Sequence, residues 1–182
     1  MSPEKIKSSV AIYYISDDGM FPNNNVLPVL FYKSILTLPT FFPARGVRNL
    51  FKDNGWGNSW KDSIYDYHHY HSITHEALGV YKGKTKVQLG GEYGIELTLE
   101  KGDVIIIPAG VAHKNLTPKN KFKCVGAYPD GKDYDIKTGQ QGERPETDEN
   151  IKAVPIPLKD PVFGLKGELQ KNWVSPLTHS AI

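Results

Sequence analysis

Short stretches of alternating apolar and polar residues fill the middle of the chain. The alternation is clearest over residues 84–89 and 95–99, where apolar residues recur at every second position, as on a half-buried strand. The glycine-containing segment 90–94 lies between them and predicts a hairpin loop. Residues 104–107 are apolar throughout, which predicts a strand covered on both faces.

Further elements follow from the same pattern. Strands are also predicted over 8–15 (an edge strand), within 26–38 and centred on 29–32, and over 65–71, 78–81 and 122–127. A short helix is predicted over Pro43–Asn54, where Val47, Leu50 and Phe51 share one face and Gly55 provides a stop, and we expect it on the outside of the strands.

The C-terminal third has a different pattern. Residues 129–150 are polar and predict a long loop, whereas 151–173 mix apolar residues with prolines and show no helical period. We therefore expect an extended arm that lies on the strands or on a partner subunit. Short strands with frequent turns indicate an all-β sandwich or barrel. We expect a single domain over 1–182, with a core barrel at about 63–127, N-terminal strands and helix at 8–62, and a C-terminal loop and arm at 128–182.

Composition narrows the class of protein. The 17 glycines and 13 prolines fit many turns. A net charge of +2 without a basic cluster argues against nucleic-acid binding, and no run of 18 apolar residues predicts a membrane span. The first ten residues lack the pattern of a signal peptide, and the single cysteine, Cys124, cannot form an internal disulfide, so we expect a cytoplasmic protein. Cys124 lies in an apolar run, where a buried core residue is favoured over a reactive thiol.

Five of the six histidines lie in the central part of the chain. On a strand, His69 and His71 would point to one face and Tyr70 to the other. Two imidazoles on one face can chelate a metal ion at little entropic cost, because the strand already fixes them. Glu76 follows after four intervening residues and can return to the same space if the chain reverses.

A fourth ligand must come from elsewhere, and His113, just after the turn at 108–110, is the candidate. Three imidazole nitrogens and one carboxylate suit Fe(II), Mn, Ni, Zn or Cu. Such a site keeps a position open for water or substrate.

These residues also carry a family resemblance. The first motif reads His69-Tyr70-His71, four residues, Glu76, six residues, Gly83, and the second reads Gly102, five residues, Pro108-Ala109-Gly110, two residues, His113. Both motifs, in this order and spacing, resemble those of the cupin superfamily. Two positions depart from the pattern: Ser63 replaces a glycine, and Thr117 replaces a final asparagine, with Asn115 nearby.

The rest of the chain is similar to small YjlB-like bacterial cupins. The matching segments are 27–32, 54–56, 68–71, 126–131 and 142–145. The resemblance implies a cupin double-stranded β-helix, or jelly-roll barrel, with a short helix before the first motif and an extended C-terminal arm. It implies one divalent metal ion held by His69, His71, Glu76 and His113, and a homodimer.

The resemblance also implies a function at that metal. It favours an enzyme, a dioxygenase, decarboxylase or isomerase acting on a small polar or chelating molecule, and Glu76 is the candidate catalytic base. A non-catalytic small-ligand-binding or sensor protein is the alternative, although no DNA-binding helix-turn-helix is evident. A metal-free structural barrel, with hydrogen-bonded histidines inside it, is the second alternative.

The remaining candidates have simpler interpretations. We expect His68 at the surface and His179 in a mobile C-terminus. His75 is expected in a turn, or as a residue that supports one of the metal ligands. The aromatic residues Tyr65, Tyr67, Tyr81, Trp56 and Trp60 could line a mouth, but packing is the favoured role. A solvated loop is likewise favoured over a lid for Glu143, Arg144 and Asp148.

Overall fold

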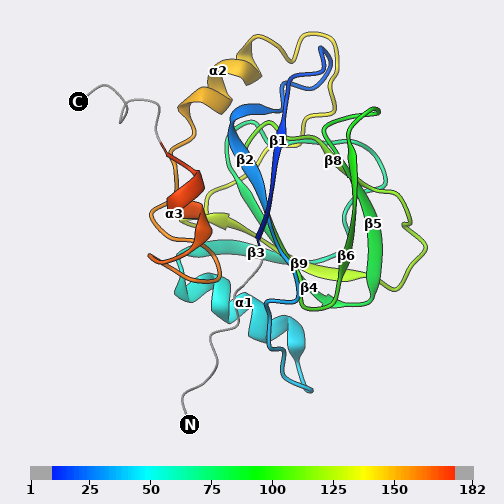
Figure 1. The fold of residues 1–182 in the computed structure, drawn as a ribbon. Coiled ribbons are helices and arrows are strands. Elements are labelled where there is room, and N and C mark those ends of the chain that lie inside the picture. The colour runs from blue at the N-terminus through cyan, green and yellow to red at the C-terminus, as the bar shows by residue number, and fades with distance from the viewer. Residues whose placement is uncertain (1–9, 175–182) are drawn as a thin grey trace.

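Two antiparallel sheets build the protein, as Figure 1 shows in the computed structural model, which describes residues 10–174. The larger sheet has the strand order β1-β2-β7-β4-β9-β3, and the smaller has the order β6-β5-β8. The strands are β1 Val10–Ile15, β2 Asn24–Tyr32, β3 Trp56–Asp62, β4 Glu76–Lys82, β5 Lys84–Leu89, β6 Ile95–Glu100, β7 Val104–Ile107, β8 His113–Asn115 and β9 Lys123–Pro129. The predicted jelly-roll barrel is therefore confirmed.

The larger sheet is covered on both faces. Its inner face contributes Leu78 and Ile105 to a core shared with Val87 and Leu89 of the smaller sheet. Its outer face buries a second cluster that includes Ile106. Strand β7 thus alternates between two apolar layers, as its continuous apolar run predicted.

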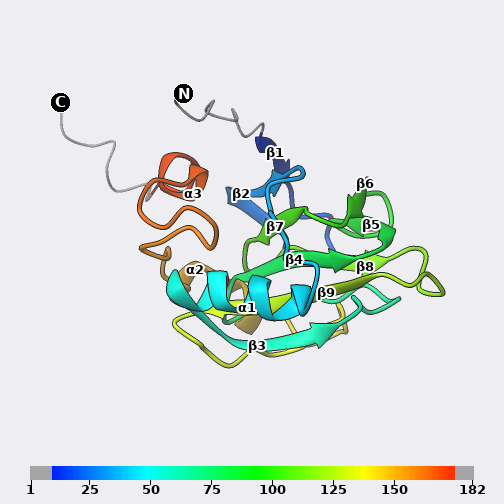
Figure 2. The ribbon, with the colours of Figure 1, turned by 90° about the horizontal axis from the view of Figure 1, so that it is seen from below.

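Helix α1, Pro43–Asp53, forms where the sequence predicts a helix and lies across the outer face of the larger sheet (Figure 2). It buries Val47 and Phe51 against Gly79 of β4. A Cβ atom on Gly79 would lie 2.5 Å from Val47 Cγ1 and 2.9 Å from Phe51 Cζ, so this close packing requires a glycine. Gly55, with a φ of +82°, provides the predicted stop.

The C-terminal arm lies on the barrel of its own chain. Trp173 is buried and its Nε1 donates to the carbonyl of Pro28 in β2 at 2.8 Å. The buried Asp160 carboxylate accepts from the Tyr32 hydroxyl and from the amide of Leu169, and so ties the arm to the same strand. The prediction of an arm without helices is wrong, because it contains α2, Glu146–Ala153, and α3, Glu168–Asn172. The predicted loop over 129–150 therefore ends before α2.

Three strand predictions need correction. Strand β3 was not predicted, and it is an edge strand with an irregular register between Gly57 and Trp60. The predicted strand over 65–71 does not form, since this segment makes only isolated bridges through His69 and Tyr70. Strand β8 was also missed, because three residues are too short to show a period.

The predicted edge strand at the N-terminal side is confirmed as β1, and residues 8 and 9 lie outside the described part. His179 also lies outside it. The expected homodimer stays a prediction. Within residues 10–174, the structure has no helix long and apolar enough to cross a membrane.

Candidate metal centre

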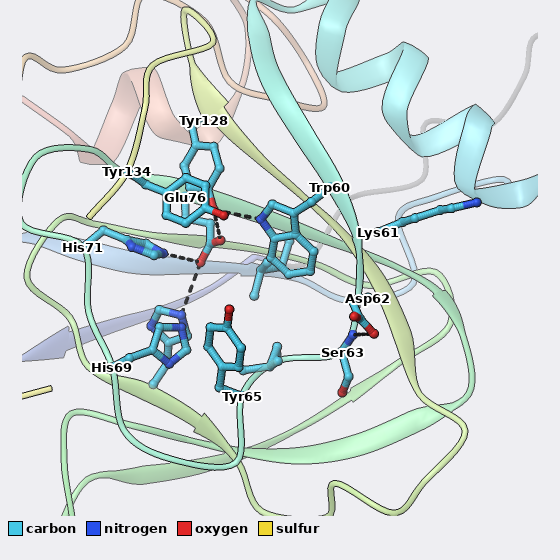
Figure 3. Close-up of a pocket in the computed structure, with 13 residues that line it drawn as sticks. Trp60, Lys61, Asp62, Ser63, Tyr65, His69, His71, Glu76, Tyr128 and Tyr134 are labelled. Carbon is cyan, nitrogen blue, oxygen red and sulfur yellow. Dashed lines mark hydrogen bonds and ion pairs between the residues drawn. The ribbon is translucent and has the colours of Figure 1, made fainter. Parts of the chain in front are cut away.

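Three histidines from separate segments meet inside the barrel. The nitrogen atoms that His69, His71 and His113 can offer as ligands lie within 4.8 Å of one another, and all three side chains are buried. Backbone hydrogen bonds in both directions between His69 and His113, of 3.2 and 2.9 Å, bring the two cupin-like motifs together. Figure 3 shows the imidazole of His71 facing the carboxylate of Glu76.

Glu76 is the first residue of β4, and its buried carboxylate faces two of the rings. Its Oε2 lies 3.2 Å from Nε2 of His113 and 3.5 Å from Nε2 of His71. Its Oε1 accepts a hydrogen bond of 3.0 Å from the hydroxyl of Tyr128. No hydrogen bond within the described residues satisfies Oε2. A buried carboxylate oxygen without a donor is costly, which indicates that a cation belongs beside it.

Backbone carbonyls fix the orientation of all three rings. The Nδ1 atoms of His69, His71 and His113 lie 3.3, 2.5 and 3.1 Å from the carbonyl oxygens of Tyr67, Asp135 and Val111. A neutral imidazole that donates from Nδ1 has its lone pair on Nε2. The three Nε2 atoms are therefore the available ligand atoms, and a carbonyl behind a ring is the usual support for a metal-binding histidine.

The electrostatics suit an ion with two positive charges. Burial, reinforced by the charge of His113, lowers the pKa of His69 to about 3, so this ring is neutral at physiological pH. Burial raises the pKa of Glu76, but the charge of His71 and the close approach of the His113 and His71 rings outweigh it, so the net pKa is lowered and the carboxylate is ionised. Neutral imidazoles beside a carboxylate are the donor set of divalent transition metals.

The spacing of these atoms also fits one shared ion. Ligands bound at ~2.0–2.2 Å to a common metal ion lie roughly 3–4 Å apart. The separations from Glu76 Oε2, at 3.2 and 3.5 Å, are in that range. The buried histidine triad thus suggests a divalent metal site, and the part of Glu76 as its fourth ligand stays a prediction.

A cavity of about 230 Å³ opens beside these residues. The cavity is lined by aromatic, aliphatic and polar side chains in addition to the four candidate ligands. These residues are Trp60, Lys61, Asp62, Ser63, Ile64, Tyr65, Leu78, Tyr128 and Tyr134. Tyr65 and Trp60, for which packing was the favoured role, line this cavity, whereas Trp56 packs in the outer apolar cluster.

Trp60 forms one wall because its strand neighbour is a glycine. Trp60 pairs with Gly126 of β9, and a Cβ atom on Gly126 would lie 2.2 Å from the indole. The indole Nε1 donates to the Tyr128 hydroxyl at 2.8 Å, and that hydroxyl donates to Glu76. Trp60 therefore orients Tyr128, which in turn orients the carboxylate.

The other singled-out residues lie away from the cavity. His68 is half-buried and bonds Gln88 at 3.2 Å, so the prediction of a surface histidine is wrong. His75 is buried, and its Nδ1 accepts from the amide of Ala109, which fits the predicted turn role. Cys124 is buried in the core as predicted.

The polar residues of the C-terminal loop also form internal contacts. Arg144 bridges Asp17 and Asp148, and Glu143 accepts from the Tyr70 hydroxyl and two loop amides. None of these residues lines the cavity. Sequence reasoning missed Tyr128 and Asp135, since neither lies in a spaced motif.

Comparison with known proteins gives two kinds of match. The profile of a family described as "Cupin domain" matches residues 62–125. The "Uncharacterized protein YjlB" of Bacillus subtilis (strain 168) is 41% identical over 162 residues, which cover 89% of this chain and 95% of that protein.

Solved structures with similar folds share less sequence. Acireductone dioxygenase from Bacillus anthracis, with a cadmium ion in its active centre, is 14% identical over 55% of this chain and 77% of its own, with a TM-score of 0.38. The coconut allergen cocosin is 16% identical over 44% of this chain, with a TM-score of 0.35, and this chain spans only 23% of it.

Proposed function

The chain belongs to the cupin family, and on that premise we propose that it is a metal-dependent enzyme acting on a small chelating molecule. The observation that carries the proposal is the orphaned Oε2 of Glu76, buried beside the imidazoles of His71 and His113 at a cavity that the whole histidine triad lines. His69, His71, Glu76 and His113 would hold the ion. A bound divalent ion would supply Lewis acidity and, if redox-active, a means of using dioxygen.

The charges near the cavity favour one class of ligand. Two positive charges on an ion and one negative charge on Glu76 leave a net charge of +1. Among the other residues that line the cavity, Lys61 is the one basic side chain, and it is exposed. A monoanionic oxygen chelator would neutralise the site, whereas a dianion would bring a second charge with no buried cation to pair with it.

The protein's own groups would then orient this ligand. Trp60, Tyr65 and Leu78 would contact the apolar part of the chelator. The metal centre would bind its oxygen atoms. Glu76, ionised in the metal-free protein, is the one buried carboxylate at the cavity and so the candidate proton acceptor. The reaction would be of the dioxygenase, decarboxylase or isomerase type.

Metal content and ligand-dependent oxygen uptake test this proposal. Protein purified from its own host should contain about one divalent ion per chain, measured by elemental analysis. The iron(II)-loaded protein should consume oxygen with acetylacetone, which chelates a metal ion as its monoanionic enolate, faster than with oxalate, a dianion. Tight binding of acetylacetone without any turnover would favour the ligand-binding alternative, and protein that takes up no metal would leave the structural barrel.

Metal binding should also release a proton in mildly acidic solution. Burial lowers the pKa of His71, but the nearby charge of Glu76 outweighs it, so the net pKa is raised. Below that pKa the His71 ring carries a proton that the ion must displace, and metal affinity therefore falls as the pH falls. Calorimetry of zinc binding at about pH 6 should therefore give binding enthalpies that differ between two buffers of different ionisation enthalpy, because the buffer takes up the released proton.

The difference between buffers should vanish as the pH rises through the pKa of His71. His69 should contribute no proton, because its pKa of about 3 leaves it neutral. Equal heats in both buffers at the lower pH would contradict a protonated His71.

A further inference from the structure

The segment Tyr134–Lys137 follows β9 and returns along the histidine-bearing segment 69–73. Lys137 and Tyr70 exchange two backbone hydrogen bonds of 2.9 and 3.0 Å, which fix the register between the two segments. The Tyr134 ring stacks on Tyr128 at 4.5 Å between centroids and meets the edge of the His71 ring at 5.2 Å. The 134–137 segment therefore contacts both the candidate ligand His71 and the tyrosine that orients Glu76.

His71 depends on this segment in a way that the other two histidines do not. The Nδ1 atoms of His69 and His113 bond carbonyls two residues earlier in their own segments. The Nδ1 of His71 bonds the carbonyl of Asp135, which is 64 residues away in the sequence. The orientation of one ring out of three is thus set by a contact from another part of the chain.

The side chain of Asp135 holds that carbonyl in place. One carboxylate oxygen accepts from the amides of Ser72 and Ile73, at 2.7 and 3.4 Å. The other accepts from the Ser72 hydroxyl at 2.5 Å. Ser72 is fully buried and Asp135 is half-buried, so the two bonds to Ser72 are partly shielded from water, which strengthens hydrogen bonds to a carboxylate.

We propose that Asp135 is a positioning residue of the metal centre: its carboxylate grips Ser72, so that its own carbonyl orients His71 to bind the ion. The inference rests on the proposed metal site. Asp135 lies ten residues beyond the stretch that matches the cupin domain profile, 62–125. This contact therefore extends the site into the C-terminal part of the chain.

Zinc affinity of the full chain, measured by chelator competition, tests the proposal. Asp135→Ala should bind zinc about 10–100-fold more weakly than wild type, the usual cost of losing a residue behind a ligand. Asp135→Asn keeps one acceptor oxygen for the Ser72 amide and should lose less. Asp133→Asn is the matched control, because Asp133 is exposed in the same loop and, among the described residues, its carboxylate accepts a hydrogen bond from Asn58 alone, at 3.5 Å. The zinc affinity of this variant should equal that of wild type.

A second readout separates positioning from a general loss of structure. The visible spectrum of the cobalt(II)-loaded protein reports the ligands directly, and it should change in Asp135→Ala but not in Asp133→Asn. Ser72→Ala removes one of the same bonds and should give a smaller loss of affinity, which keeps the test open if Asp135→Ala does not fold.

The outcomes are distinguishable. Equal zinc affinity and equal cobalt spectra in wild type, Asp135→Asn and Ser72→Ala would overturn the role of Asp135 and leave the metal site standing. A wild-type protein that binds neither zinc nor cobalt would overturn the proposed function, and this inference with it.

Discussion

Replacing His113 with alanine is expected to strip the protein of its metal ion. His113 supplies the nitrogen atom nearest to the orphaned oxygen of Glu76, at 3.2 Å, and its ring is buried where water replaces it poorly. Losing a ligand should cost more than the about 10–100-fold in affinity that losing a residue behind a ligand costs. Elemental analysis of the purified variant, beside wild type, measures the effect.

The control is His68→Ala. His68 is the same type of residue in the same segment, but its Nε2 bonds Gln88 and it does not belong to the metal-binding group. This variant should keep the metal content of wild type. If His113→Ala kept its metal, or if both variants lost it to the same degree, the assignment of His113 as a ligand would be wrong.

Replacing Phe51 with alanine should lower the free energy of unfolding by about 3–5 kcal/mol, the usual cost of removing a buried phenylalanine. Phe51 projects from α1 onto Gly79 of β4 and is fully buried there. Removing its ring would leave a cavity that the sheet does not close. Urea denaturation monitored by circular dichroism gives the change.

The metal site should survive this large loss of stability. Phe51 belongs to the outer apolar cluster, whereas the site lies on the inner face of the same sheet. Folded Phe51→Ala should therefore bind zinc like wild type, and Asn49→Ala, at an exposed position of α1, should change stability by less than about 0.5 kcal/mol. A variant that stays folded but loses metal affinity would show that the two faces are coupled.

The sequence predicts best where a short-range pattern and the final environment agree. Strand β5 forms at the predicted bounds, and β6 ends one residue later than predicted, at Glu100, because alternating residues there separate core from solvent. Helix α1 also forms as predicted, since its apolar face and its stop at Gly55 are local signals. The three histidines and Glu76 are brought together as the two motif spacings imply.

The missed elements lack such a pattern. The sequence of β3 is polar and contains a glycine, which is compatible with an edge strand that pairs on one side only. Asn58 interrupts its regular backbone with a φ of +49°. Helix α2 is too short to show a period, but Pro145 followed by acidic residues, with Lys152 in the last turn, is a start and stop signal that could have revealed it. Asp135 could not be found, because its role comes from a contact 64 residues away in the sequence.

The pairing of Trp60 with Gly126 has a consequence for how related chains could diversify. The indole of Trp60 fills the space that a side chain at position 126 would otherwise occupy, so the residue at position 60 helps to set the width of the cavity beside the metal centre. A smaller residue at position 60 would enlarge the cavity that is open to a ligand. A larger residue at position 126 would need a smaller one at position 60 to make room for it. Neither position supplies a candidate ligand, but the indole also donates to Tyr128, so a replacement at position 60 would preserve the orientation of Glu76 only where another donor reaches that hydroxyl.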